Sequence, residues 1–196
     1  EIMPSLVGSE MCIETGTKLS AVNADDCGFA YRGSFTYRAD AGGDRVFEST
    51  PFGGGRIVAT AGNDTEIRYF LTDHLGSTRV VAKVTPTRRE DLDRKDYYPF
   101  GKEWAQPDMP TSDNRYTFSG KEKQHLRFQE IDYADFGARF YDSDGVHFLQ
   151  QDPLLEKYYP IGQYNYCAGN PVKFIDQDGR DIRITYNLSL IHISEP

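Results

Sequence analysis

The residues best suited by type and spacing to do chemistry are the aspartates of the run Asp176-Gln177-Asp178-Gly179-Arg180-Asp181. Two carboxylates that share a proton can divide acid and base roles, because like charges at close range drive their pKa values apart. Asp176 takes the first position, and Asp178 or Asp181 would be its partner. The alternative is a turn in which the carboxylates accept backbone N–H bonds and Gly179 adopts a positive φ. The residue types favour the turn, and Asp176 and Asp178 stay the candidate catalytic pair.

Asp73-His74 is a second candidate acid–base pair, and two serines are candidate nucleophiles. The pair lies next to Gly76 in a predicted hairpin turn, where such side chains usually bond the backbone. Ser77 and Ser119 each lie beside a turn glycine, but neither sits in a G-x-S-x-G elbow. Hydrolase chemistry of the serine type therefore has no support in the sequence.

The sequence contains no pattern for a metal or a cofactor. Arg139, Asp142 and Asp144 form a charged cluster, but Asp-Ser-Asp-Gly is shorter than a calcium loop and lacks its terminal Glu. The three cysteines are Cys12, Cys27 and Cys167. They show no CxxC spacing and no paired His, which argues against a zinc site. One disulfide between two of them stays an open alternative. We expect no metal and no cofactor.

The elements that must position these residues are short strands. The hydrophobic fraction is 38%, yet 13 Tyr and 12 Phe bring aromatics to 13%, and 18 Gly with 10 Pro supply frequent turns. A net charge of -8 argues against nucleic acid as a partner, since a groove along phosphates needs clustered Lys and Arg. No stretch approaches the ~20 apolar residues of a membrane span. The composition predicts a mainly β chain of antiparallel strands and hairpins with few short helices.

The segment 67–84 carries the strongest strand signal. Ile67, Tyr69 and Leu71 alternate on one face, a turn follows at 73–76, and a second strand runs through Val80 to Val84. The segment from Phe29 predicts further strands, whereas the charged stretch 86–95 predicts a solvated loop or a helical turn.

Turn glycines recur about 20 residues apart, each after aromatic or alternating apolar residues, at positions 33, 55, 76, 101 and 120. Self-similarity at such a period indicates a repeat architecture. Each unit is too small to bury its own ring face, so neighbouring units must stack and bury it jointly.

Five motifs follow one another in order: YFLTDHLGSTRVV (69–81), YYPFG (97–101), YTFSGKE (116–122), DFGARFYDSDGVHFLQQDP (135–153) and YNYCAGNPVKFIDQDG (164–179). Together they resemble the repeat-associated core of Rhs and YD-repeat proteins, the bacterial repeat-shell and polymorphic-toxin family. The form KYYPIGQYNYCAGNP is most similar to versions from Bacteroidetes-type bacteria. The resemblance covers about residues 67–180, and 14–66 resembles a more degenerate YD-type repeat region.

The resemblance implies a long β-sheet that spirals into a hollow shell, which the core segment closes and which encloses a variable C-terminal domain, often a toxin. The implied partners are that effector domain of the same polypeptide, the upstream YD repeats, and an immunity protein or cell-surface glycans. The implied location is secreted or at the cell surface, with the export signal upstream. The leading expectation is a structural and delivery role in contact between bacteria.

The resemblance also implies self-cleavage in toxin-carrying members, through aspartates around a DPxG motif that an apolar residue and a later Asp follow. Asp176 to Asp181 is the matching stretch, but Gln177 replaces the proline, Arg180 stands at the apolar position, and the later Asp is missing. An aspartyl autoprotease that releases the polypeptide downstream of Arg180 is thus an alternative. A third interpretation is a carbohydrate-binding or adhesive surface protein, because exposed Tyr can stack on sugars.

Ring side chains are expected to line or cross-link the shell and to be substantially buried: Tyr69, Tyr98, Phe100, Tyr116, Phe118, Tyr133, Phe140, Tyr141, Tyr164 and Tyr166.

The two ends of the chain differ in residue composition from its middle. Residues 1–13 and the last eight residues, 189–196, resemble translated sequencing adapters at the edges of a metagenomic fragment, so we expect 181–196 to be a truncated tail that is foreign from about 189, and we assign neither end a function.

Overall fold

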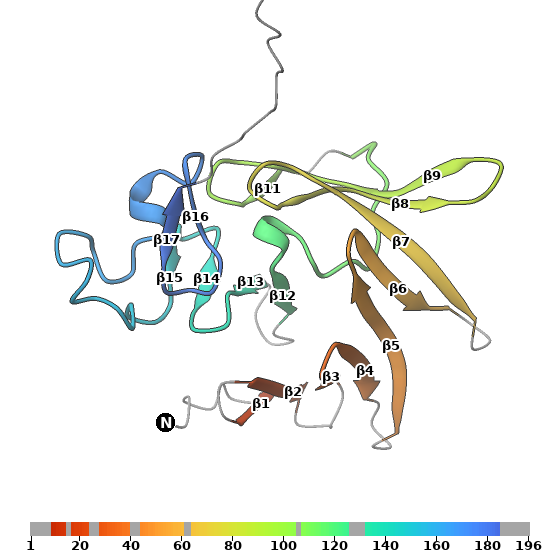
Figure 1. Cartoon of the computed structure of the whole chain (residues 1–196), viewed down its shortest axis with the longest axis horizontal. Helices are drawn as coiled ribbons and strands as arrows, with labels where there is room; N and C mark the ends of the chain where they lie inside the picture. Colours follow the sequence, from red (N-terminus) through yellow and green to blue (C-terminus); the bar gives the residue numbers. More distant parts are fainter. Residues whose placement is uncertain are drawn as a thin grey trace, which may run out of the picture.

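The computed structural model describes residues 9–14, 17–23, 28–39, 44–60, 64–104, 107–125 and 132–184 (Figure 1). This part of the chain is mainly β, as the composition predicts, and its two short helical turns are 3-10 helices, η1 (Phe118–Gly120) and η2 (Cys167–Gly169). Among the described residues, no helix is long and apolar enough to cross a membrane.

Nine strands form one antiparallel sheet in which the strand order equals the sequence order. Each strand therefore pairs with the strands before and after it in the chain, and short turns suffice to connect them. The strands are β1 (Ser9–Glu14), β2 (Thr17–Asn23), β3 (Gly28–Arg32), β4 (Phe35–Ala39), β5 (Arg45–Phe52), β6 (Gly55–Ala59), β7 (Thr65–Thr72), β8 (Thr78–Val84) and β9 (Arg89–Arg94).

The remaining strands form three small sheets that lie beside the concave side of the large one (Figure 1). The pairs are β10 (Asp96–Tyr97) with β11 (Glu103–Trp104), and β16 (Phe174–Asp176) with β17 (Ile182–Ile184). A four-stranded sheet in sequence order consists of β12 (Glu122–His125), β13 (Asp132–Asp135), β14 (Phe140–Asp142) and β15 (His147–Phe148).

The hairpin predicted for 67–84 is present as β7 and β8. Asp73 begins its turn, because its Oδ1 accepts the N–H groups of Leu75 at 3.0 Å and Ser77 at 2.9 Å. Gly76 has φ 83°, a conformation that glycine adopts without strain. Asp73 thus serves the backbone, as the turn interpretation expects.

The prediction of a loop or helical turn for 86–95 is wrong, because β9 occupies Arg89–Arg94. The chain reverses direction before β9, in a turn where Thr85 N donates to Arg88 O at 2.9 Å. The β8 ladder then recruits the next six residues despite their charge, with Val84 opposite Arg89 and Val80 opposite Arg94. Pairing along an existing strand outweighs low strand propensity here.

Four of the five predicted turn glycines have positive φ, and Gly55 serves another purpose. Gly55 lies in β6, where a Cβ would stand 1.9 Å from the carbonyl oxygen of Arg68 in β7. The neighbouring backbone approaches too closely for any side chain. The four of this set with positive φ are Gly33, Gly76, Gly101 and Gly120.

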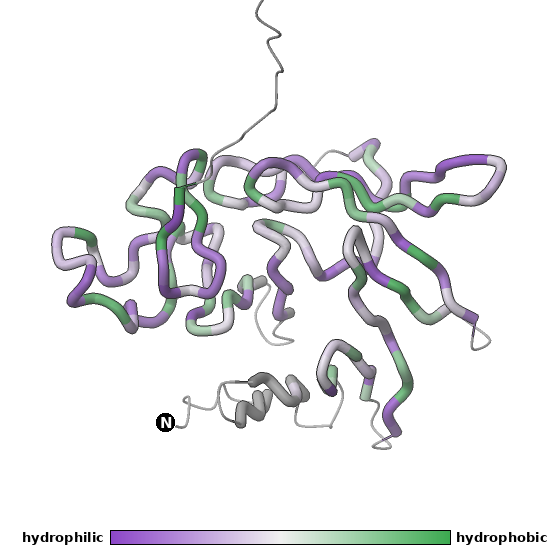
Figure 2. The backbone as a smooth tube through the Cα atoms, viewed as in Figure 1, coloured by the Kyte–Doolittle hydropathy of each residue, from purple (hydrophilic) through white to green (hydrophobic). Residues whose placement is uncertain are grey.

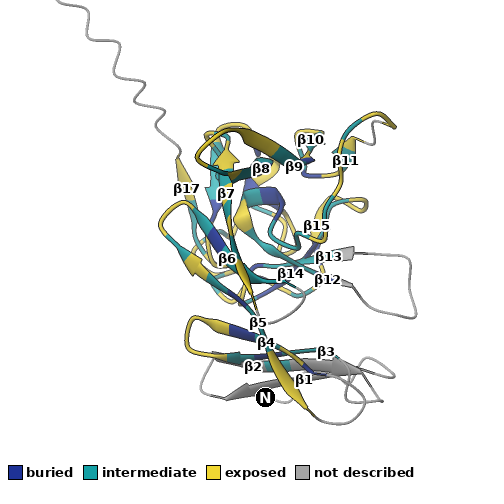
Figure 3. Ribbon diagram, turned by 90° about the vertical axis from the view of Figure 1, so that its right-hand side faces the viewer, coloured by how far each residue is buried: buried dark blue, intermediate teal, exposed yellow. Residues whose placement is uncertain are grey.

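The large sheet has a polar covered face and an apolar open face. On β7, Ile67, Tyr69 and Leu71 are 47%, 40% and 41% exposed, and they share a face as predicted. On the opposite face, Arg68 bonds Glu66 at 2.8 Å. The segment 112–118 lies over that polar face, and exposed residues run along β5 and β7 (Figure 3).

Side chains of six buried residues form a ring-rich core on the small sheets: Phe118, Phe136, Tyr141, Phe148, Tyr166 and Cys167. Tyr141 lies at its centre, fully buried, 4.3 Å from the Tyr166 ring and 5.5 Å from the Phe148 ring between centroids. Hydrophobic stretches of the chain are short and alternate with hydrophilic ones (Figure 2), so rings from several segments must gather to form this core.

The ring predictions were correct for part of the set. Burial is confirmed for Phe118, Phe140, Tyr141 and Tyr166. It is wrong for Tyr69, Tyr98 and Tyr164, which are 40%, 49% and 43% exposed, because they face away from the covered side or lie on loops. The half-buried members are Phe100, Tyr116 and Tyr133.

Candidate functional site

Asp176 ends β16 and closes a tight turn with its own side chain. Its Oδ1 accepts backbone N–H groups from Asp178 at 3.2 Å, Gly179 at 2.7 Å and Arg180 at 3.2 Å. Gly179 has φ 72°. The turn predicted from this run is confirmed, and Asp176 is 1% exposed at its centre.

Arg139 is the second buried charge of the site. Its side chain is 1% exposed, and Nη2 lies 3.3 Å from Asp176 Oδ2 and 3.1 Å from Asp152 Oδ2. Nε donates to the Gly179 carbonyl at 2.7 Å, and the guanidinium stands 3.7 Å from the centre of the Phe148 ring. One arginine therefore joins three segments that are distant in sequence.

The site brings Asp176 together with Asp152, and the Asp178 carboxylate faces elsewhere. Asp178 is exposed, and its Oδ1 accepts the N–H groups of Arg180 at 3.1 Å and Asp181 at 3.3 Å. Asp152 is 8% exposed, and its Oδ1 accepts Leu154 N at 2.7 Å. Two buried carboxylates thus share one guanidinium nitrogen.

Burial raises the pKa of Asp176, while the turn N–H groups and Arg139 act in the opposite direction. Lys121 lies on the exposed side of the turn, and its ammonium donates to the Gln177 carbonyl. Burial lowers the pKa of Lys121, and Asp176, Asp135 and Asp178 oppose that change. The turn is therefore held between two cationic side chains.

Asp181 is fixed by partners outside the turn. It pairs with Lys157 and accepts a hydrogen bond from the Tyr158 hydroxyl at 3.0 Å. The contact with Lys157 holds the pKa of Asp181 below its usual value. Asp181 is thereby directed away from Asp176.

The pairing of Arg139 with Asp152 and Asp176 was missed from sequence. Asp152 lies within the motif 135–153, but neither periodicity nor spacing connects it to a residue 24 positions later. The suggested cluster of Arg139 with Asp142 and Asp144 is not formed. Asp142 Oδ1 instead accepts N–H groups of its own turn, at 2.8 Å from Asp144 N, and Asp144 pairs with Lys102 at 3.0 Å. No group of three metal-ligating side chains occurs in the described ranges.

The remaining polar candidates have structural contacts. The Ser77 hydroxyl accepts the N–H of Ser119 at 2.9 Å, and Ser119 Oγ lies 3.3 Å from the Tyr166 hydroxyl. His74 Nε2 lies 3.3 Å from the Val172 carbonyl oxygen. Cys167 is a free buried thiol, while the side chains of Cys12 and Cys27 fall outside the described residues.

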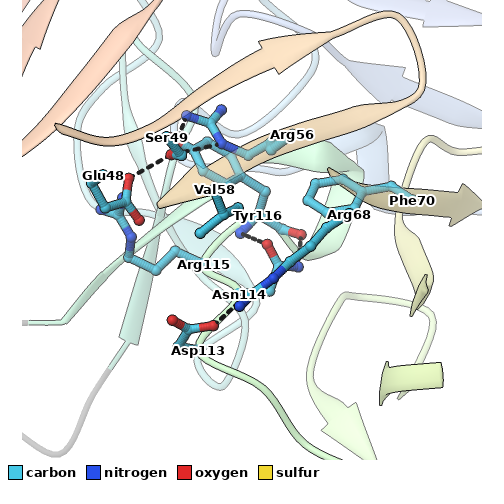
Figure 4. Close-up of a pocket in the computed structure, with 10 residues that line it drawn as sticks. All are labelled: Glu48, Ser49, Arg56, Val58, Arg68, Phe70, Asp113, Asn114, Arg115 and Tyr116. Atoms are coloured by element: carbon cyan, nitrogen blue, oxygen red, sulfur yellow. Dashed lines mark hydrogen bonds and ion pairs between the residues drawn. The ribbon is translucent and has the colours of Figure 1, made fainter. Parts of the chain in front are cut away.

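A second polar constellation lies on the covered face of the large sheet (Figure 4). Arg56 on β6, 7% exposed, donates to Ser49 Oγ from Nε at 3.1 Å and from Nη2 at 2.8 Å, and to Thr36 Oγ1 at 3.1 Å. Its guanidinium stands 4.1 Å from the centre of the Tyr116 ring. Arg115, beside it, pairs with Glu48 at 3.1 Å and with Glu122 at 2.6 Å. These contacts attach the segment 113–122 to the sheet.

No family model matches this sequence. Salivary gland surface protein 1 of Aedes aegypti is 32% identical over 122 residues, which are 62% of this chain and 3% of that protein. The chain therefore spans a small part of this relative.

Solved toxin structures share the fold. The crystal structure of TcdB2-TccC3-Cdc42 matches with a TM-score of 0.63 and 17% identity over 84% of this chain and 8% of the other. A Photorhabdus luminescens Tc holotoxin pore with a mutation in TccC3 matches with a TM-score of 0.67 and 16% identity over 91% and 9% of the two chains. The fold is thus mainly β and resembles the Rhs shell of Tc toxins.

Proposed function

We propose that this chain forms part of the wall and the closing core of an Rhs-like β-shell, which encloses the C-terminal effector domain of its own polypeptide. The observation that carries the proposal is the sheet of nine strands in sequence order, beside a ring-packed core, in a fold that Tc toxin chains share. Sequential strands can extend a wall by one hairpin at a time. The chain acts through packing in this role.

The proposed location is outside the producing cell or on its surface, and the further partners are upstream YD repeats and an immunity protein. Such a wall would isolate the effector from proteases and solvent. The interior contacts of the core would then determine whether the shell stays closed.

The experiment is limited proteolysis of a polypeptide that carries this chain between upstream repeats and a downstream domain. We expect the downstream domain to resist cleavage until the shell opens, and Tyr141→Ala in the core to make it sensitive. Tyr69→Ala, on the open sheet face, is the matched control. Equal cleavage of the downstream domain with and without the shell segment would contradict enclosure.

A second candidate function is aspartyl self-cleavage that releases the polypeptide downstream of Arg180. The observation in its favour is that Asp152 and Asp176 are buried and share Arg139 Nη2. In this reaction one carboxylate would take a proton from water as the water oxygen bonds to the scissile carbonyl carbon, and the other carboxyl group, which carries a proton, would protonate the leaving amine as the C–N bond breaks. Arg139 would hold the two carboxylates in place.

Electrophoresis of the same long polypeptide tests this candidate. We expect the parent to give two fragments, and Asp176→Asn and Asp152→Asn each to give one intact band. Asp178→Asn should still be cut. A single intact band in the parent protein would rule self-cleavage out.

A third candidate, binding of surface glycans, is favoured by one exposed ring pair. Tyr98 and Trp104 are 49% and 55% exposed and stack with centroids 5.7 Å apart and planes 16° apart. Sugar rings stack on such faces. Glycan-array binding that Trp104→Ala abolishes would support it, and equal binding by the variant would not.

A further inference from the structure

A hollow of about 370 Å³ opens at the end of the large sheet, beside Arg56. Three turns surround it: the β5–β6 turn with Gly54, the β7–β8 turn with Gly76, and η1 with Gly120. A Cβ at Gly54 would meet the Phe52 ring at 3.6 Å, and one at Gly76 would meet only Ser119 backbone at 4.0 Å. The glycines of these three turns leave space that side chains would otherwise occupy.

The walls of the hollow are apolar rings, and its charged group is a guanidinium. Phe52, Phe70 and Tyr116 line it, and Arg56 lies between it and the ion-pair network. Small-molecule sites commonly combine an apolar lining of such size with a few fixed polar groups. The Oγ1 of Thr78, another lining residue, is buried with no hydrogen-bond partner in the described part of the chain.

Arg56 is buried, and no carboxylate of the described residues pairs with it. The partners of Nε and Nη2 are neutral hydroxyls, and Nη1 has no partner among the residues that the structure describes. In Figure 4 this nitrogen points away from Glu48 and Arg115. Ser49 donates to Glu48 Oε2 at 2.5 Å, but the same oxygen already accepts from Arg115 at 3.1 Å. A buried guanidinium is most stable with an anion, so an N–H group is left ready for one.

We propose that this hollow binds a carboxylate attached to a flat apolar body, with Arg56 bonding the carboxylate and Phe52, Phe70 and Tyr116 enclosing the body. A small aromatic acid and an acidic residue beside a ring in a polypeptide both present this chemistry. The proposal is independent of the shell function, since it concerns a site complete within this chain.

The test is ligand-observed saturation-transfer NMR on the monomeric fraction of the full chain, with benzoate and benzamide as probes. Benzoate should bind with a dissociation constant on the order of 1 mM, and benzamide about tenfold more weakly, because only benzoate carries the charge. Arg56→Gln should weaken benzoate at least about tenfold. Equal binding of the two probes, or none, would overturn the proposal.

A blocking variant keeps the test decisive if Arg56→Gln unfolds. Thr72 is exposed and lines the hollow, so Thr72→Trp should fill it and prevent binding without touching the guanidinium. Thr65→Trp, at the other exposed end of β7, is the matched control and should bind as the parent does. Unchanged benzoate binding in Thr72→Trp would exclude this hollow as the site.

The source of the carboxylate is distinguished by a peptide arm. Acetyl-Phe-Asp-Phe-amide is compared with its Asn analogue and with benzoate. A polypeptide source predicts that the Asp peptide binds more tightly than benzoate and that its Asn analogue binds more weakly. Tighter binding of benzoate indicates a small acid, and loss of both in Thr72→Trp places them in one site.

Discussion

The nine-stranded sheet and the ring core hold together by different means. In the sheet, each strand bonds its sequence neighbours, the apolar face is open, and charged pairs such as Arg68 with Glu66 occupy the covered face. In the core, side chains from residues 118 to 167 pack around Tyr141. The sheet is therefore specified by local pairing, and the core by contacts between distant segments.

The largest expected effect comes from removing the central ring of the core. Tyr141→Ala should lower the free energy of unfolding by about 5 kcal/mol, since it leaves a cavity and breaks the hydroxyl's 2.8 Å bond to the Phe100 carbonyl. Tyr69→Ala in the sheet should cost less than about 1 kcal/mol. Chemical denaturation measures both, and equal losses would abolish the distinction between the regions.

Removing an arginine charge should also lower the free energy of unfolding more in the core than in the sheet. Arg139→Met strands Asp152 and Asp176 as buried carboxylates and should cost about 3–5 kcal/mol. Arg68→Met should cost about 1 kcal/mol, because its partner Glu66 keeps an ion pair with Lys83 and its other partner, Asp113, is mostly exposed. Adding Asp152→Asn and Asp176→Asn to Arg139→Met should restore part of the loss in the same denaturation assay. No recovery in the triple variant would show that the arginine acts by packing alone.

Glycine substitutions give a third comparison. Gly101 has φ 91°, and a Cβ there would stand 2.5 Å from the Phe118 ring, so Gly101→Ala should cost about 3 kcal/mol. Gly33, at φ 60°, has open space around it, since a Cβ there would meet no atom within 4 Å, and Gly33→Ala should cost about 1 kcal/mol. Thermal unfolding measures both variants, and equal losses of stability at the two turns would contradict this expectation.

The reactivity of the Cys167 thiol shows whether the ring-rich core is closed to solvent. Burial raises the pKa of Cys167 to about 12 from 9.0. Because the folded pKa is the higher one, its contribution to stability is complete below pH 9.0 and declines as the pH rises towards 12. At pH 8, alkylation of Cys167 should be at least about 100-fold slower in the folded chain than in denaturant. Peptide-resolved mass spectrometry measures the rates, and similar rates would indicate an open core.

The smallest change in unfolding free energy concerns the open face of the sheet. Ile67 and Tyr69 lie exposed there, and apolar faces beside sheet edges promote association. Ile67→Lys should reduce concentration-dependent self-association in sedimentation experiments with little loss of stability. Thr65→Lys, at the exposed start of the same strand, is the control. A parent chain that stays monomeric at all concentrations would contradict the expectation.

Features that depend on neighbours in sequence were predictable. Alternation and turn residues located the hairpin of β7 and β8, and the Asp176 turn followed from Asp178-Gly179. The strand β9 was missed because its ladder, and not its residue types, determines its conformation. The Arg139 site was missed because burial of charges joins segments that no local pattern connects.

The sequential order of the large sheet also has a mechanical consequence. A chain pulled from one end of such a sheet meets one strand ladder at a time, and its hydrogen bonds break in succession. The strands should then separate one after another, with each released residue adding about 3.3 Å of length. The ring core, whose segments interlock, should resist as one unit and yield last or all at once. A sheet with this strand order can be unwound in sequence, without any strand having to pass another.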